Sequence, residues 1–205
     1  TLPEAAVAKL ERFVDRGGSL LVFLGDQVQP GFYNSRLADP GRLRGGLLPA
    51  RLTGAGPRGD PKSDQPVARL GNFASDHAAL AGFDSGETGS LGGVTLSAYW
   101  GLEPAAGGTT RVLMATDGGD PLLCERSYGG GRVALFASSC DRDWNNLPVR
   151  PAFLPFVYRL FGYLAQEASS QQEDGSVARG SFFQTGQRVL EPLPVGAQSA
   201  AIRVA

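Results

Sequence analysis

Two thiols and one imidazole are the first candidates for nucleophilic chemistry in this sequence: Cys124, Cys140 and His77. A cysteine attacks as its thiolate, so it needs a base or a cation nearby. Cys124 falls inside an expected strand at 121–128, which favours a small buried thiol. Cys140 follows an expected central strand at 132–137, at the end where α/β sheets place their sites. A Cys140–His77 dyad is therefore the catalytic hypothesis, and a structural role for these residues is the alternative.

The spacing of the two cysteines argues against a disulfide. A hairpin that turns at Gly129-Gly130 pairs Cys124 with Leu135 and leaves Cys140 five residues further along. At roughly 3.4 Å per residue this separation is about 17 Å, which is beyond the reach of a disulfide. One histidine and two distant cysteines are also too few ligands for zinc. We therefore expect free thiols, no metal and no cofactor.

The segment that follows Cys140 carries side-chain oxygens at alternate positions. Asp141, Asp143 and Asn145 are spaced as at the start of a calcium loop, but Ala152 occupies the place of the twelfth-position glutamate. Two other interpretations stay open. In one, the aspartates cap the next helical turn and Trp144 packs against the domain edge. In the other, these polar groups and Trp144 form a rim that binds a small ligand or a partner.

Asp26 and Asn34 are candidates at a second expected strand end. Asp26 could line the same crevice as the 141–146 loop, although an Asp after Gly is also ordinary turn chemistry. The predicted binding residues are therefore Asp26 and Asn34 together with Asp141, Asp143, Trp144 and Asn145. The glycine run at 129–131 is not a phosphate loop, because no helix is expected to follow it.

The composition is that of a folded domain. Among 205 residues, 19 Lys and Arg oppose 20 Asp and Glu, and this balance argues against a nucleic-acid binder with a broad basic face. Apolar residues make up 42% and charged residues 19%, which is enough to build a core. No run of about 18 apolar residues predicts a membrane span. The first residues lack both a signal-peptide pattern and an initiator Met, so we interpret the chain as a piece of a longer protein.

A helix and a strand are expected at the start of the chain. Val7, Leu10 and Val14 form an apolar stripe at helical spacing, and Gly17-Gly18 ends the helix. The continuous apolar run at 19–24 then predicts a strand covered on both faces, as in a parallel sheet.

The middle of the chain is irregular and is followed by strands. Residues 26–93 are broken by Gly and Pro, with helical turns expected at 34–38 and 75–80 and a short strand at 65–70. After this stretch the strand pattern returns four times, at 94–100, 110–115, 121–128 and 132–137.

The sequence predicts a change of organisation near its end. An apolar face predicts a helix at 151–166. Residues 1–168 are then expected to form one α/β domain and the polar residues 169–178 a linker. Residues 179–205 are expected to begin a small β-domain, because so short a β-pattern cannot close a core alone.

Several segments together resemble class I glutamine amidotransferase-like domains. Residues 10–25 match the helix, Gly-Gly, strand, Gly step of these domains. Residues 129–133, 141–144, 147–148 and 153–155 resemble the closing segment of one subgroup. That subgroup occurs in bacterial membrane-anchored proteins of the Bat aerotolerance type, after a von Willebrand factor A domain and before a small β-domain.

The resemblance implies a flavodoxin-like α/β sandwich with a mostly parallel central sheet and a C-terminal β-hairpin, followed by the start of a β-rich segment. It implies a first strand upstream of Thr1. It also implies a parent protein tethered to the bacterial inner membrane, with this domain on the extracytoplasmic side. Active members of the superfamily carry a Gly-x-Cys-x-Gly elbow with a histidine, and this sequence has no such elbow.

Three functions are compatible with these features. The first hypothesis is a non-catalytic interaction or ligand-sensing domain, which binds protein partners, other domains of the parent chain or a small ligand. The second is a degenerate hydrolase that uses Cys140. The third is a purely structural spacer. An exposed sheet edge next to the missing strand would also allow a dimer.

Overall fold

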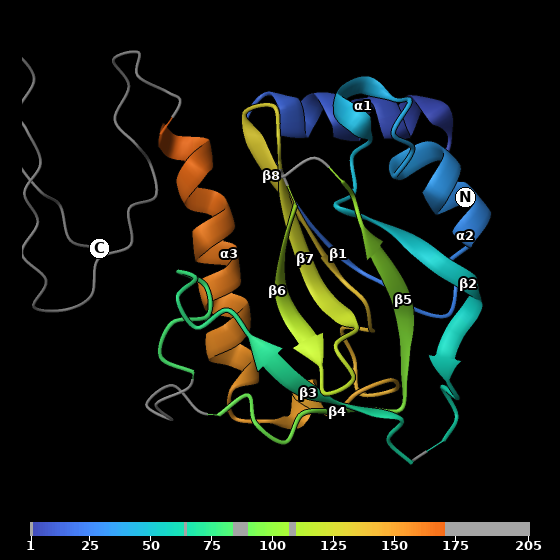
Figure 1. Cartoon of the computed structure of the whole chain (residues 1–205). Coiled ribbons are helices and arrows are strands. Elements are labelled where there is room, and N and C mark those ends of the chain that lie inside the picture. Colours follow the sequence, from blue (N-terminus) through green and yellow to red (C-terminus); the bar gives the residue numbers. More distant parts are fainter. Residues whose placement is uncertain (1, 64, 84–89, 107–109, 171–205) are drawn as a thin grey trace, which may run out of the picture. The chain divides into compact units, whose positions relative to one another are not determined.

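The computed structural model describes residues 2–63, 65–83, 90–106 and 110–170 (Figure 1). All of these residues belong to one compact unit. The predicted β-rich segment at 179–205 and all of the predicted linker except residues 169 and 170 lie outside the described residues. The predicted domain boundaries therefore stay predictions.

The described helices and strands have the following bounds. The helices are α1 (Glu4–Asp15), α2 (Pro30–Phe32) and α3 (Phe153–Ser170), with single turns at η1 (Tyr33–Leu37), η2 (Leu43–Gly45) and η3 (Leu147–Val149). The strands are β1 (Ser19–Phe23), β2 (Ala50–Gly59), β3 (Ala68–Phe73), β4 (Thr95–Leu96), β5 (Ala98–Pro104), β6 (Thr110–Thr116), β7 (Pro121–Tyr128) and β8 (Gly131–Phe136).

The main sheet is mixed rather than mostly parallel, so the predicted flavodoxin-like fold is wrong. Within the described residues its strand order is β1-β8-β7-β6-β3-β4. β1 and β8 run parallel, with Leu20 opposite Val133. The other four pairs of this sheet are antiparallel. A separate antiparallel pair joins β2 to β5.

Short connections explain why antiparallel pairs dominate. β6, β7 and β8 follow one another through tight turns at Gly119 and Gly129, both of which have positive φ angles. Parallel neighbours would instead need long crossover connections, usually helices, between consecutive strands. The described chain has no helix between β2 and β8 apart from isolated turns, so only the distant strands β1 and β8 pair in parallel.

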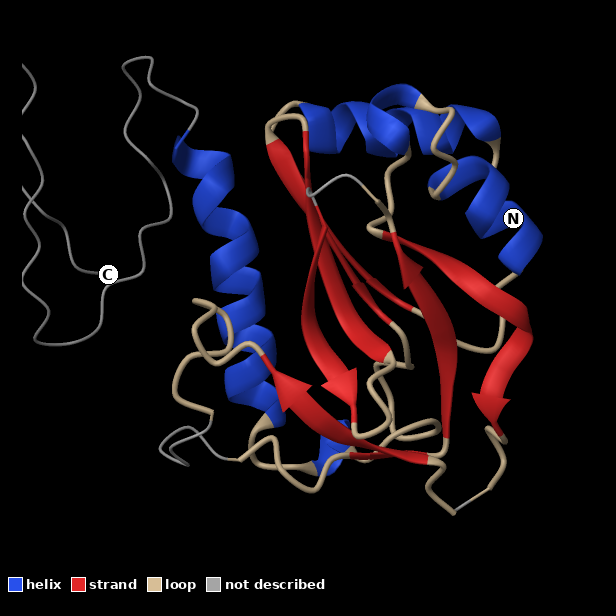
Figure 2. Cartoon of the chain, in the orientation of Figure 1, coloured by secondary structure: helices blue, strands red, loops and turns tan. Residues whose placement is uncertain are grey.

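The main sheet lies between α3 on one side and the β2–β5 pair on the other, with α1 near the β7–β8 turn (Figure 1, Figure 2). Phe156, Leu160 and Leu164 of α3 are buried, as the apolar face predicted, whereas Phe161 is exposed. β5 lies on the opposite side of the sheet (Figure 1), and its Trp100 is buried. No helix of the described residues is long and apolar enough to cross a lipid bilayer.

Several local predictions are confirmed. The first helix ends at Asp15, and Gly17, whose φ is 101°, takes the left-handed conformation just after the cap; the amide of Gly18 donates to the carbonyl of Phe13. The 121–128 strand and its hairpin partner form with Cys124 opposite Leu135. Both cysteines are free thiols.

Two elements differ from the sequence prediction. The ten-residue strand β2 lies within the stretch that was hard to assign. The strand expected at 94–100 is interrupted at Ser97, so that β4 belongs to the main sheet and β5 to the smaller one. The backbone amides of Ser97 and Ala98 both donate to the carbonyl of Trp144, which stabilises this change of sheet.

Candidate functional site

An open pocket of about 300 Å³ lies where the chain passes from β4 to β5. Thr95 and Ser97 line it from this strand junction, and Ser63 and Pro66 line it from the segment before β3. The opposite wall comes from the loop after β8, through the residues Arg142, Asp143, Asn145, Asn146 and Val149. The pocket therefore contains two of the predicted binding residues, Asp143 and Asn145.

Asn145 holds the loop in place with its side chain. Its Nδ2 donates to the hydroxyl of Ser138 at 3.1 Å and to the carbonyl of Ser139 at 2.9 Å. Its Oδ1 accepts the amide N–H of Leu147 at 3.1 Å. Asn145 is buried, so these bonds replace water that its amide would otherwise bind. The side chain therefore forms the wall of the pocket, with its amide already bonded to the chain.

Asn146 fixes the loop to β4. Its side-chain Oδ1 accepts the backbone N–H of Thr95 at 2.9 Å, and its backbone N–H donates to the carbonyl of Thr95 at 3.1 Å. The hydroxyl of Ser97 donates to the carbonyl of Asp143 at 3.3 Å. The two walls of the pocket are thus joined by hydrogen bonds, which makes its shape largely preformed.

Arg142 and Asp143 provide the charges at this pocket. Both side chains are exposed, and neither makes an ion pair with another described residue. Asp141 is also exposed, and its carboxylate accepts the amide N–H of Asp143 at 3.0 Å in a local turn. An unpaired guanidinium beside an unpaired carboxylate can bind a molecule that carries both an anionic group and a donor.

Trp144 is a core residue rather than part of a binding rim. Its side chain is only 3% exposed, and it belongs to the main hydrophobic cluster. The structure therefore places Trp144 in the core, as in the packing alternative, and not among the residues that line the pocket. Burial of this large ring anchors the loop from inside.

Asp26 and Asn34 are not part of the pocket. Asp26 is exposed and accepts a hydrogen bond from the side chain of its neighbour Gln27. Asn34 donates to the carbonyl of Leu52 at 2.9 Å and accepts the Leu52 amide at 2.8 Å, so its side chain pairs with β2 as a strand would. The structure thus does not bring Asp26 to the crevice of the 141–146 loop, and the alternative of a turn residue stays open for it.

Arg142 and Thr95 were not singled out by the sequence. Arg142 lies between Asp141 and Asp143 in the predicted binding loop, and it was missed because the pattern considered only side-chain oxygens at alternate positions. Thr95 falls within the strand predicted at 94–100, and the apolar pattern gives no sign that this strand is interrupted at Ser97. The oxygen-rich pattern thus identified the segment, although not all of its lining residues.

The cysteines and the histidine lie in different environments. Cys124 is fully buried in β7, and burial raises the pKa of its thiol to about 12. Cys140 is exposed, beside the pocket in sequence but not among its lining residues. No described ion pair or hydrogen bond joins Cys140 to His77. The geometry of the described residues therefore offers no base for a Cys140 nucleophile.

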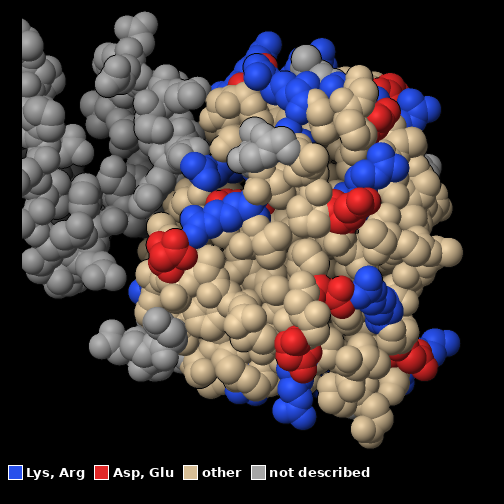
Figure 3. All heavy atoms as spheres, in the orientation of Figure 1, with Lys and Arg blue, Asp and Glu red and all other residues tan. Residues whose placement is uncertain are grey.

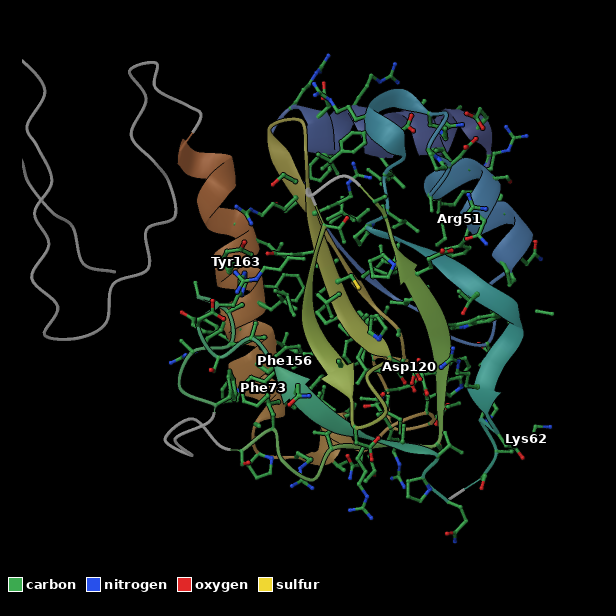
Figure 4. The ribbon with its side chains drawn as sticks, viewed as in Figure 1. Arg51, Lys62, Phe73, Asp120, Phe156 and Tyr163 are labelled. Carbon is green, nitrogen blue, oxygen red and sulfur yellow. The ribbon has the colours of Figure 1, made fainter. Side chains whose placement is uncertain are left out.

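His77 belongs to a buried cluster beneath α3. Its Nδ1 accepts the amide N–H of Ala79 at 3.2 Å, and its Nε2 lies 3.2 Å from a carboxylate oxygen of Glu125. The other oxygen of Glu125 lies 3.6 Å from the guanidinium of Arg132. The ring of Tyr163, labelled on α3 in Figure 4, packs edge-on against the imidazole, with the two ring centroids 4.4 Å apart. Nδ1 is therefore bonded to the backbone, whereas Nε2 faces the Glu125 carboxylate without completing a hydrogen bond.

Charge is dispersed on one face of the molecule. On the face shown in Figure 3, basic and acidic side chains are interspersed over a largely uncharged surface. No group of three or more His, Cys, Asp or Glu in the described part of the chain is arranged to hold a metal ion. The small polar pocket beside β4 is therefore the candidate binding site of the described residues.

No family model and no curated protein matches the chain. Its fold is similar to that of the cytoplasmic protein STM1381 from Salmonella typhimurium LT2, with a TM-score of 0.59 and 22% identity, over 78% of this chain and 60% of that one. It is also similar to the cytoplasmic protein STM3548 from Salmonella typhimurium, with a TM-score of 0.57 and 18% identity, over 80% and 62%. The chain spans about three fifths of each, and the similarity concerns the fold.

Replacing Asn145 by aspartate should loosen the pocket. In Asn145→Asp a carboxylate oxygen faces the carbonyl of Ser139, where an amide donated before. We expect the free energy of unfolding to fall by about 2 kcal/mol, because a buried acceptor loses its donor and a charge is buried. Urea denaturation measures the change. The control is Asn72→Asp on the exposed surface of β3, and an equal loss in both variants would contradict the role of Asn145.

The buried imidazole should make stability depend on pH. Burial is the main cause that lowers the pKa of His77 below 6.5, helped by Arg111 and Arg132 and opposed by Glu125. Below pH 6.5 the unfolded chain therefore binds a proton that the native chain does not, and stability falls as the pH drops.

The variant His77→Asn, whose side-chain oxygen can still accept the Ala79 amide, isolates this effect. Between pH 7.5 and 5.5 the wild-type protein should lose more stability than the variant, by at most about 1.4 kcal/mol per pH unit below 6.5. Urea denaturation at both pH values provides the comparison. Identical losses in the two proteins would show that His77 does not titrate in this way.

Proposed function

We propose that this chain is a non-catalytic ligand-binding domain, which acts as an interaction or ligand-sensing unit of a larger protein. The observation that carries the proposal is the pocket beside β4, where Arg142 and Asp143 make no ion pair within the described chain. Concave sites with a few convergent polar groups on a preformed frame are typical of small-molecule recognition.

The pocket chemistry favours a small ligand of mixed polarity. A guanidinium binds carboxylates and phosphates through paired N–H donors, so Arg142 would take an anionic group. Asp143 would accept from an ammonium, amide or hydroxyl of the same molecule. A volume of about 300 Å³ is at the lower end of ligand pockets, which favours a molecule the size of an amino acid or a small organic acid.

The two catalytic candidates with shifted pKa values, Cys124 and His77, do not line the pocket, which supports binding rather than catalysis. Cys124 and His77 both have pKa values moved by burial, and both lie in the interior rather than on the pocket wall. Catalytic sites usually gather such groups in the cleft itself. A hydrolase that uses Cys140 would need a base that no described contact provides.

On the resemblance to amidotransferase-like domains, we also propose that the parent is a membrane-anchored bacterial protein with this domain outside the cytoplasm. The similar Salmonella structures are named as cytoplasmic proteins, so location is a real test. Fractionation of the full-length parent and protease digestion of intact spheroplasts should find it in the membrane and cleave the domain from outside. Recovery in the cytosolic fraction, or full protection from protease, would contradict this location.

Ligand titration monitored by NMR amide shifts tests the binding function. The probes are a panel of small organic acids and amino acids, with inorganic phosphate as a bare anion. We expect saturable shifts of amides in 142–146 and at Ser97 for at least one probe. In Arg142→Ala the dissociation constant should rise about tenfold or more, because a charge-assisted hydrogen bond is lost.

The matched control is Arg12→Ala, which removes an exposed arginine from α1. Its dissociation constant should equal that of the wild-type protein. Equal weakening in both variants would indicate general electrostatics rather than a site. The absence of saturable shifts with every probe would overturn the proposal and favour the structural spacer.

A further inference from the structure

β1 forms an open edge of the main sheet. It pairs with β8 on one side, and no described strand pairs with it on the other. The amide of Leu24 donates to the carbonyl of Phe136 at 3.1 Å, so the backbone groups of Leu20 and Val22 also point to β8 by the alternation of a strand. The backbone groups of Leu21 and Phe23 therefore point outward, where a further strand would bind.

None of the usual edge protections is present in β1. Its sequence, Ser19–Phe23, contains no charge and no proline, and its register against β8 is unbroken by a bulge. Natural edges are usually protected by such features because an unprotected edge pairs with other chains. All five residues are partly exposed. At the opposite edge, β4 is only two residues long and offers little to pair with.

One flank of α3 carries an exposed apolar stripe. Leu154, Tyr158 and Phe161 are 75%, 66% and 55% exposed, and their spacing places them on one side of the helix. They lie beside the buried face formed by Phe156 and Leu160. Large apolar side chains gathered on one exposed surface commonly mark an interaction site.

This stripe lies on the β1 side of the helix. On the opposite flank, Arg159 donates to the carbonyl of Ala81 and lies over the ring of Phe83. The segment that contains Ala81 follows β3 and is bonded to β6 through the amide of Ala74. Because β6 and β1 lie on opposite sides of β7 and β8, the flank away from Arg159 faces the open edge.

α1 carries an exposed aromatic side chain on the layer opposite α3. Phe13 is 54% exposed, and its ring lies against Gly18 at the start of β1, where a side chain on Gly18 would overlap it. The opposite flank of α1 carries Asp15, which bonds to Arg44 at 2.7 Å, and the Arg44 carbonyl accepts from Arg126 of β7. Phe13 is therefore on the side of α1 that faces away from β7.

From this arrangement we propose that the β1 edge, with the flanks of α1 and α3, binds a second copy of this chain. The two β1 strands pair antiparallel about a two-fold axis perpendicular to the sheet. That axis preserves the faces of the sheet, so Tyr158 and Phe161 of α3 meet the same helix of the partner copy. Phe13, which lies against Gly18 at the start of its own β1, would then lie near the end of the partner's β1. The surface is self-complementary because it is apolar on both layers and β1 carries no charge.

The spacing of the elements agrees with this pairing. Paired strands lie about 4.8 Å apart. α3 packs on both β1 and β8, so its axis lies about half a strand spacing inside the edge. Two copies of α3 would then be about 10 Å apart, which is within the usual range for packed helices. The strand pairing and the helix packing can therefore form at the same time.

Sedimentation velocity and light scattering on the 205-residue chain over a wide range of concentration test the proposal. We expect a species of twice the 21.5 kDa chain mass at high concentration. Leu21→Pro removes an outward-pointing amide, and Tyr158→Glu places a charge in the helix contact. Each should raise the dimer dissociation constant by about tenfold or more while the far-ultraviolet circular dichroism stays unchanged.

The control is Val67→Glu, which places the same charge at an exposed apolar residue outside this surface and should leave the dimer intact. A wild-type chain that stays monomeric at every concentration would overturn the proposal and would leave a strand of the parent chain upstream of Thr1, or a strand of another protein, as the occupant. A dimer that resists both Leu21→Pro and Tyr158→Glu would overturn it as well. The inference is independent of the pocket, because Arg142→Ala should not change the oligomeric state.

Discussion

The position of β8 between β1 and β7 is the constraint on which the rest of the structure depends. Val133–Phe136 are buried on both faces, and this strand forms the parallel pair with β1 and the hairpin with β7. The chain then leaves the sheet through Ser138, whose hydroxyl donates to the carbonyl of Ala98 at 3.0 Å. The pocket loop therefore starts from a fixed point, and Asn145 and Asn146 only have to hold its far end.

Buried charges organise the irregular half of the chain. The guanidinium of Arg126 on β7 donates to backbone carbonyls between Arg44 and Leu48. Its burial lowers the pKa of this arginine, and hydrogen bonds to carbonyls compensate for the lost water. On the other side of the sheet, Glu125 faces His77 and Arg132. Two neighbours on β7 thus attach segments from opposite layers, which explains how a long stretch with little regular structure packs tightly.

The sequence predicted what depends on local patterns. The first helix, its glycine cap and the hairpin register of Cys124 and Leu135 follow from neighbouring residues, and all of them are confirmed. The prediction of a mostly parallel sheet was wrong. The apolar run in β1 is typical of a parallel strand, but it carries no information about the direction of the other strands. β2 escaped notice because its sequence, with three glycines and a proline, lacks alternation over much of its length.

The candidate site was predicted in part for the same reason. The alternate oxygens lie in the loop that lines the pocket, but whether each side chain faces solvent or backbone depends on distant partners. Asn34 pairs with Leu52 and Trp144 enters the core, and neither contact has a local signal. Asn145 lines the pocket while its amide is bonded to the chain, so it shapes the site, whereas Arg142 and Asp143 keep their charges available. A frame whose own polar groups are already bonded loses little conformational freedom when a ligand enters. That division between framing and binding residues supports the proposed role in recognition, and His77 and Cys124, the buried catalytic candidates, lie away from the pocket.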